Sequence, residues 1–190
     1  HRRGIDQLTL QGDIFVNSIG DSLLQPSLAA PFTRPDIVDS KEKGGNIRLR
    51  WDRTLSEKSS IMLQTYYDRV NNQLAPWTKY AESFDVDFQH RLPLFTRHDV
   101  TWGLNYRLYN NKIQETELTT FTPNQKTNHN FSAFIRDEIM LLPDKLSLFL
   151  GTRLDHNDFT GLEVQPSGRL MWTLNEQNSI WTSISRAVRI

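Results

Sequence analysis

Residues whose chemistry could support catalysis or metal binding are few in this chain and lie far apart. The chain has five histidines, none of them paired with another at metal-ligand spacing: His1, His90, His98, His129 and His156. Cysteine is absent, which removes thiolate ligands, disulfides and cysteine nucleophiles together. The densest polar cluster is Asp155-His156-Asn157-Asp158. It ends a predicted strand and leads into a loop, so we interpret it as a solvated turn and not as a metal site.

Two carboxylates, Asp85 and Asp87, share one face of a predicted strand, as a general acid–base pair would. A row of solvated charges on that face explains them without any further assumption. The sequence contains no glycine-rich phosphate loop and no Gly-x-Ser-x-Gly nucleophile elbow. We therefore expect that the chain is not an enzyme and that it has no catalytic residue, metal or cofactor.

A third group of side chains has the chemistry of a binding site. The expected connection Leu74–Tyr80 carries Trp77, Lys79 and Tyr80. Two aromatic rings beside a cation can stack on aryl groups of a ligand and balance its negative charge. These three residues are our ligand-binding candidates. The alternative is that Trp77 anchors the loop or contacts lipid.

The elements that would position these residues are β-strands. Alternation of apolar and polar residues with a period of two predicts nine of them, and no stretch has the 3.6-residue period of a substantial helix. The predicted strands are Gln7–Ser18, Gly45–Thr54, Ser60–Asn71, Ala81–Leu92, His98–Ile113, His129–Leu141, Leu146–Asp158, Gln165–Leu174 and Ser179–Ile190. The sixth is the least regular, because Phe134 falls in its polar set.

The polar faces of these strands are charged. Alternation places on them Arg48, Arg50, Asp85, Asp87, Arg107, Arg136 and Arg153. In a soluble sheet such residues form the solvent face, whereas in a wide barrel they line a wet lumen. Alternation alone does not distinguish the two cases.

The connections between the strands alternate between short and long. The short ones are Leu55–Ser59, Leu94–Arg97, Leu142–Lys145 and Asn175–Asn178, and the longer ones are Ile19–Lys43, Leu74–Tyr80, Gln114–Asn128 and Phe159–Val164. In an antiparallel up-and-down meander every second connection lies on the same rim. An outer-membrane β-barrel typically has tight turns on one rim and loops on the other. Its strands have about 10 residues, the length that crosses a bilayer at a tilt. The connections and strands of this chain follow that pattern. We expect the loop rim to be extracellular.

Tryptophan positions agree with a membrane setting. Trp51, Trp102, Trp172 and Trp181 all lie beside tight turns, as an aromatic girdle at a membrane–water boundary would. Trp181 fits less well, because it alternates with Ile180 and Ile184 and so lies on the opposite face of its strand from them. The alternative is four core tryptophans at one end of a soluble sandwich. No apolar run approaches the ~18 residues of a membrane helix, which a barrel does not need. The 190 residues suffice for one domain, and with a formal net charge of zero they show no nucleic-acid footprint.

The stretch from Leu146 to Ile190 resembles the C-terminal barrel of TonB-dependent outer-membrane receptors. The resemblance rests on Leu148-Phe149-Leu150-Gly151-Thr152-Arg153-Leu154-Asp155, then on 159–170 with Gln165-Pro166 and Arg169, and finally on Ser179-Ile180-Trp181 with Ser185-Arg186-Ala187-Val188-Arg189. The opening Asp6–Asp13 extends it more weakly across most of the chain.

The resemblance implies a Gram-negative outer-membrane receptor that imports a scarce nutrient, such as a ferric siderophore or cobalamin, driven by the TonB complex. Such receptors have a 22-stranded barrel that is closed by an N-terminal plug domain. We expect residues 1–190 to be one partial barrel domain without a plug and without the final strands. Its partners would be outer-membrane lipid, the missing plug and strands, an unidentified small-molecule ligand, and TonB through an absent N-terminal region.

The sequence is also compatible with two other classes of protein. The first is a soluble β-sandwich binding module, for example lectin-like, in which the apolar faces pack against a second sheet. The second is a different outer-membrane barrel, such as an enzyme or an adhesin. With no signal peptide at His1-Arg2-Arg3-Gly4, an exported protein would contain this chain as an internal piece.

Overall fold

The computed structural model describes residues 5–74, 77–115 and 120–188, and its regular elements there are all β-strands. They are β1 (Ile5–Pro26), β2 (Thr33–Thr54), β3 (Ser60–Leu74), β4 (Trp77–Leu94), β5 (His98–Gln114), β6 (Gln125–Leu142), β7 (Leu146–Asn157), β8 (Gly161–Asn175) and β9 (Asn178–Ser185). In the part of the chain that the structure describes, no helix is long and apolar enough to cross a membrane.

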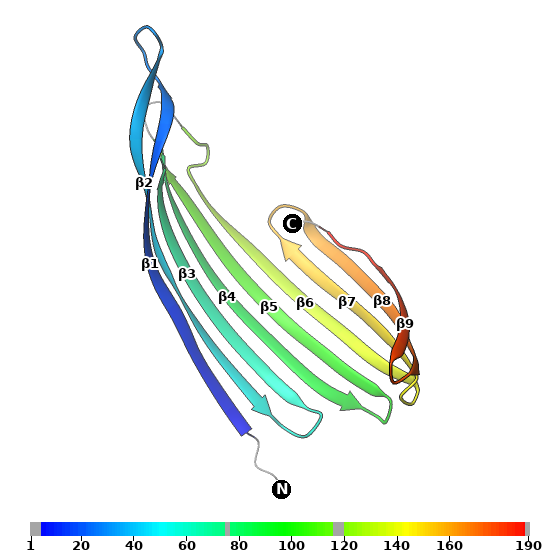
Figure 1. Ribbon diagram of the computed structural model, residues 1–190. Coiled ribbons are helices and arrows are strands. Elements are labelled where there is room, and N and C mark those ends of the chain that lie inside the picture. The colour runs from blue at the N-terminus through cyan, green and yellow to red at the C-terminus, as the bar shows by residue number, and fades with distance from the viewer. Residues whose placement is uncertain (1–4, 75–76, 116–119, 189–190) are drawn as a thin grey trace.

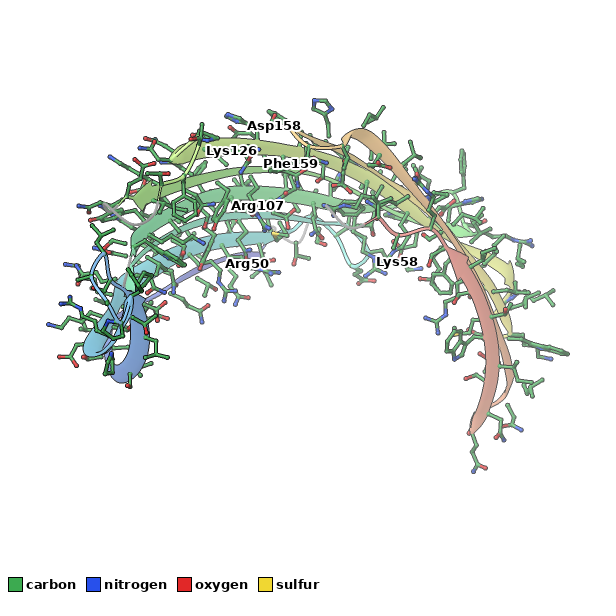
Figure 2. All side chains as sticks on the ribbon, turned by 90° about the horizontal axis from the view of Figure 1, so that it is seen from above. Arg50, Lys58, Arg107, Lys126, Asp158 and Phe159 are labelled. Carbon is green, nitrogen blue, oxygen red and sulfur yellow. The ribbon has the colours of Figure 1, made fainter. Side chains whose placement is uncertain are left out.

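The strands form one sheet in sequence order, with every neighbouring pair antiparallel. The sheet curves into an open arc (Figures 1 and 2). The predicted all-β, nine-strand up-and-down meander is therefore confirmed. The tight turns lie on one rim and the β1–β2 and β5–β6 connections on the other, as the alternating connection lengths predicted (Figure 1).

The β-sandwich alternative is wrong. A sandwich buries one face of each sheet against a second sheet, whereas this chain forms a single layer. Among the described residues Val100 is the one buried apolar side chain, and large apolar residues such as Leu104 and Phe131 are more than half exposed. Such a layer has no core of its own. Within this chain it is stabilised by the backbone hydrogen bonds between strands and by side-chain contacts between neighbouring strands on each face.

The predicted loop Ile19–Lys43 is mostly strand. β1 and β2 stay paired from Ile19↔Ser40 to Pro26↔Thr33, which leaves residues 27–32 as the connection. The pairing of β2 with β3 stops at Lys41↔Gln73, so the end of the β1–β2 hairpin projects beyond the sheet (Figure 1). Polar residues interrupt the alternation here, so the sequence pattern does not predict a strand. The backbone hydrogen bonds between β1 and β2 do not depend on that alternation.

The predicted loop Leu74–Tyr80 is also shorter than expected. β4 begins at Trp77 and pairs with β3 from Leu74↔Trp77 onward, so Trp77, Lys79 and Tyr80 belong to a strand. At the other end of the chain, β8 begins earlier than predicted, at Gly161, and β9 ends at Ser185.

The irregular sixth strand has a steric explanation. Phe134 on β6 lies opposite Gly103 on β5. A Cβ atom on residue 103 would lie 2.5 Å from Cε1 of Phe134 and 2.6 Å from the Phe88 carbonyl oxygen. The phenyl ring therefore occupies the space that the glycine leaves empty, on a face that is otherwise polar.

Candidate functional site

The two faces of the sheet differ in chemistry. Figure 2 shows Arg50 and Arg107 on the concave side of the arc. Because paired residues on neighbouring strands share a face, the register places the other predicted lumen charges on the same side. All seven candidates lie on this concave face: Arg48, Arg50, Asp85, Asp87, Arg107, Arg136 and Arg153.

Several of these side chains contact other polar groups on the same face. The Arg107 Nε donates to Asp85 Oδ2 at 2.8 Å, and Asn105 Nδ2 donates to Asp85 Oδ1 at 3.2 Å. Asp85 is 6% exposed. Charge-assisted hydrogen bonds therefore compensate its burial. On β2, the Arg50 guanidinium donates to both carboxylate oxygens of Asp52, at 2.7 and 2.8 Å.

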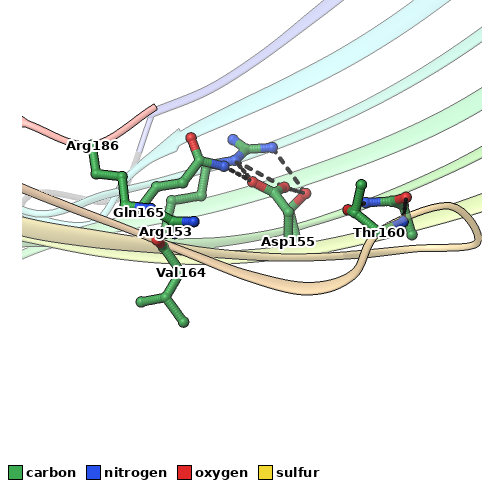
Figure 3. Close-up of polar contacts among 8 residues, drawn as sticks. Arg153, Asp155, Thr160, Val164, Gln165 and Arg186 are labelled. Carbon is green, nitrogen blue, oxygen red and sulfur yellow. Dashed lines mark hydrogen bonds and ion pairs between the residues drawn. The ribbon is translucent and has the colours of Figure 1, made fainter. Parts of the chain in front are cut away.

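The most buried polar group lies further along the same face, on β7. Asp155 is 1% exposed. Its carboxylate accepts from Arg153 Nε at 2.9 and 3.0 Å and from Gln165 Nε2 at 2.6 Å (Figure 3). The Ser132 hydroxyl, from β6, donates to it as well. Three strands thus contribute to one carboxylate.

The sequence prediction for this segment was partly wrong. Asp155 does not lie in a solvated turn, because it faces inward two residues before the end of β7. The turn begins with Asn157, whose Oδ1 accepts from the backbone N–H of Phe159 at 2.8 Å and of Thr160 at 2.9 Å. His156 points to the opposite face. Ser132 and Gln165 escaped the sequence analysis, although alternation and register would have placed both beside Asp155.

The polar network continues to the edge of the sheet. Arg186 follows β9 and reaches back to β8, where its Nη2 lies 3.1 Å from Glu163 Oε2. It also donates to the Val164 carbonyl oxygen (Figure 3). The concave face therefore carries polar side-chain contacts between β1 and β2, between β4 and β5, and among β6, β7 and β8.

The structure separates the three predicted ligand-binding residues. Along β4, Trp77 and Lys79 share the concave face with Asp85, whereas Tyr80 shares the convex face with Phe84. The Trp77 ring packs edge-on against Phe121, from the β5–β6 connection, with centroids 5.8 Å apart. The Tyr80 hydroxyl lies 3.5 Å from Gln114 Oε1. A ligand-binding role for these residues stays a prediction.

The convex face is apolar, with three of the four expected girdle tryptophans. Trp51, Trp102 and Trp172 point outward from strand ends beside the tight turns. Trp181 does not, because the β8–β9 register sets it opposite Met171 on the concave face. Its indole lies 4.8 Å from the Arg169 guanidinium carbon there. The prediction of a fourth girdle residue is therefore wrong.

The convex face ends in polar residues toward the loop rim. Arg69 Nε and Glu82 Oε1 lie 3.3 Å apart on it, and His129 and His156 lie on the same face further along the sheet. An apolar band between polar limits is the surface that a bilayer requires of a barrel wall. Within the described residues, no group of three or more histidine and carboxylate side chains is placed to hold a metal ion.

The sequence matches the model of the family described as TonB dependent receptor-like, beta-barrel, over residues 6–190. The chain belongs to this family. Proteins of the family are transporters and not enzymes, so the expectation of no enzymatic function is confirmed. Membership of this family also excludes the alternative of an outer-membrane enzyme or adhesin barrel. No curated protein matches the chain in sequence.

Solved structures share the fold. A variant of the ferric enterobactin receptor PfeA from Pseudomonas aeruginosa is 17% identical, with a TM-score of 0.71 over 95% of this chain and 31% of that one. The siderophore receptor PirA from the same organism is 16% identical, with a TM-score of 0.60 over 95% of this chain and 36% of that one. PirA from Acinetobacter baumannii is 15% identical, with a TM-score of 0.62 over 90% of this chain and 30% of that one.

The chain spans about a third of the length of the receptors it matches, 31% and 36% of the first two. A complete barrel of 22 strands, of which this sheet would supply nine, is consistent with these relatives. Barrels of this family are outer-membrane proteins of Gram-negative bacteria. The described sheet is therefore a sector of a barrel wall, with a polar and a membrane-type face.

Proposed function

We propose that this chain forms part of the wall of an outer-membrane receptor that imports ferric siderophores with energy from TonB. The observation that carries the proposal is the contrast between the two faces of one sheet. Its concave face holds the charged network around Asp85 and Asp155, and its convex face is apolar with tryptophans near one rim. Water in a lumen and lipid outside satisfy both faces at once.

The ligand class follows from the relatives and from chemistry near the loop rim. The named receptors PfeA and PirA are described as receptors for ferric enterobactin and for siderophores. On this chain, Trp77 and Lys79 offer a ring and a cation on the concave face. An aryl-bearing anionic siderophore suits both. We propose Trp77 and Lys79 as ligand contacts and assign Tyr80, which faces outward, to the lipid side.

The remaining partners belong to the same proposal. The arginines and aspartates of the concave face would border a plug domain and water, and the convex face would border outer-membrane lipid. Residues 1–190 would then be one partial barrel domain that depends on further strands for closure. TonB would act through a segment outside this domain.

The test is uptake by the complete receptor that contains this chain. Iron-starved cells lacking other siderophore receptors are given radiolabelled ferric enterobactin, with and without a functional TonB. We expect cell-associated iron only when both the receptor and TonB are present. Iron accumulation that does not depend on TonB would refute the proposal. So would the absence of iron accumulation for every member of a panel of catecholate, hydroxamate and mixed siderophores.

A further inference from the structure

The β5–β6 connection meets the start of β4 through one pair of aromatic rings, Phe121 and Trp77. The ring centroids lie 5.8 Å apart and the ring planes are inclined by 87°, which is an edge-to-face arrangement. Among the described residues 120–127, Phe121 is half-buried and the others are exposed. Trp77 is half-buried as well. Each ring therefore restricts the movement of the other.

Two hydrogen bonds tie this connection to the end of β5. The Phe121 backbone N–H donates to Oε1 of Glu115, the residue that follows β5, at 2.8 Å. Three residues further on, the Asn124 carbonyl oxygen accepts from the backbone N–H of Ile113 at 2.7 Å. The first bond is the stronger type, because its acceptor is charged. The position of the Phe121 ring is therefore set from β5 by way of Glu115.

Trp77 has a strand partner on one side only. It pairs with Leu74 of β3, whereas the pairing of β4 with β5 starts one residue later, at Thr78↔Gln114. A side chain at such a strand end keeps more than one staggered conformation within reach. The Phe121 ring lies against the indole and limits that choice. The orientation of Trp77 therefore depends on the β5–β6 connection as well as on its own strand.

A fixed indole has a consequence for binding. Contacts between aromatic rings are favourable only in certain relative orientations of the ring planes. A ring that already has its bound orientation loses little conformational freedom when a ligand arrives, and this raises affinity. Trp77 shares the concave face with Lys79, which supplies a cation for an anionic ligand. The pair therefore suits a ligand that carries both negative charge and aryl groups.

We propose that Phe121 and Glu115 are positioning residues, which orient the Trp77 indole for stacking on an aryl group of an anionic siderophore. The inference rests on the proposed function, because it takes Trp77 as a ligand contact. It deepens that function, because it makes the β5–β6 connection a determinant of the preference for aryl-bearing ligands. Phe121 acts through Trp77, and Glu115 acts through Phe121.

The test is a double-mutant cycle on the complete receptor, displayed on cells and titrated with labelled ferric enterobactin. Trp77→Leu keeps an apolar contact with Phe121 but removes the stacking ring, and it should weaken binding about fivefold. Phe121→Leu should weaken binding about threefold. The double variant should again lose about fivefold, because Phe121 acts only through Trp77. If Trp77 merely anchored the connection, leucine would replace it with little loss.

Two variants of Glu115 separate its hydrogen bond from its charge. Glu115→Gln and Glu115→Ala remove the same negative charge, but only glutamine keeps an acceptor for the Phe121 N–H. We expect binding to be about threefold weaker in Glu115→Ala than in Glu115→Gln. The matched control is Phe32→Leu, which makes the same change as Phe121→Leu at a ring that is 65% exposed in the β1–β2 connection. It should bind like the unmodified receptor.

Several results would overturn the inference. They are additive losses for Trp77→Leu and Phe121→Leu, full binding by Trp77→Leu, equal binding by the two Glu115 variants, and no binding of ferric enterobactin by the unmodified receptor. Uptake by the same cells separates two failures. TonB-dependent uptake of any siderophore would leave the proposed function intact and refute this inference alone, whereas a lack of uptake for the whole panel would refute both.

Discussion

Arg50 and Arg153 each hold an aspartate two residues further along the same strand, on the same concave face. The Nε–Oδ2 distances are 2.7 Å to Asp52 and 2.9 Å to Asp155, and the two arginine side chains are 43% and 45% exposed. The aspartates differ, since the Asp52 side chain is 35% exposed and that of Asp155 is 2% exposed. The two Arg-x-Asp pairs therefore form a natural comparison of an open and a buried carboxylate.

We predict that Arg153→Met destabilises the receptor more than Arg50→Met does. Removing Arg153 leaves the Asp155 charge buried with only Ser132 and Gln165 as donors, at a cost of about 3 kcal/mol. Removing Arg50 leaves a partly solvated carboxylate, at a cost of about 0.5 kcal/mol. Urea unfolding of the receptor in lipid vesicles would measure both. Equal losses for the two variants would mean that burial of Asp155 does not matter energetically.

A second prediction at the residue scale concerns the ligand. Trp77→Ala and Lys79→Ala should each weaken ferric enterobactin binding about fivefold, for a contribution of ~1 kcal/mol per contact. Tyr80→Ala, on the opposite face of the same strand, and Pro123→Ala are the controls. Titration of surface-displayed receptor with the labelled ligand gives the dissociation constants. If all four variants bind like the parent, this part of β4 has no role in ligand binding.

At the scale of the elements, a large side chain on one strand packs over a small residue on the neighbouring strand. Phe134 covers Gly103 on the concave face, and the ring and the Phe88 carbonyl leave no room for a Cβ. We predict that Gly103→Ala destabilises the sheet by about 1–3 kcal/mol, as overpacking does. Gly20→Ala is the matched control, because a Cβ at that position would meet only the Asp39 carboxylate, at 3.9 Å. The same unfolding assay decides, and equal stability of the two variants would contradict the steric argument.

The strands that were predictable from the sequence are those with two chemically different faces. β5 was placed to within one residue of its end, because Trp102, Leu104 and Tyr106 alternate cleanly with polar residues. The end of the β1–β2 hairpin was not predictable, since its alternation is broken and only backbone pairing defines it. The girdle prediction for Trp181 was wrong because proximity to a turn gives only the rim. Its alternation with Ile180 and Ile184 already indicated the other face, and the register agrees.

The face of each tryptophan leads to a further prediction. In variants that keep a single tryptophan, lipids brominated on their acyl chains should quench Trp51, Trp102 and Trp172, which lie on the convex face. Trp181 and Trp77 should be quenched weakly, because a barrel wall separates them from lipid. Fluorescence in reconstituted vesicles is the measurement. Strong quenching of Trp181 would show that the β8–β9 register differs in the membrane.

At the scale of the whole molecule, the chain is a single curved layer with unlike faces and unlike rims. Alternation and connection lengths predicted the meander and its two unlike rims, whereas a β-sandwich was excluded only by the single layer of the structure. The polar network was only partly predictable. The seven charges could be assigned to one face, but the cross-strand partners of Asp155 depend on register over three strands.

Under the proposed function this layer crosses the outer membrane with its loop rim outside, and single-cysteine labelling tests that orientation. Ala29→Cys lies in the β1–β2 connection on the loop rim, and Glu57→Cys lies in the tight β2–β3 turn on the other rim. Each is introduced into the complete receptor with any other cysteine removed, and intact cells are treated with a membrane-impermeant maleimide. We predict labelling of Ala29→Cys in intact cells and of Glu57→Cys only after the outer membrane is permeabilised. Equal labelling of both sites in intact cells, or the reverse pattern, would show that the loop rim does not face the outside of the cell.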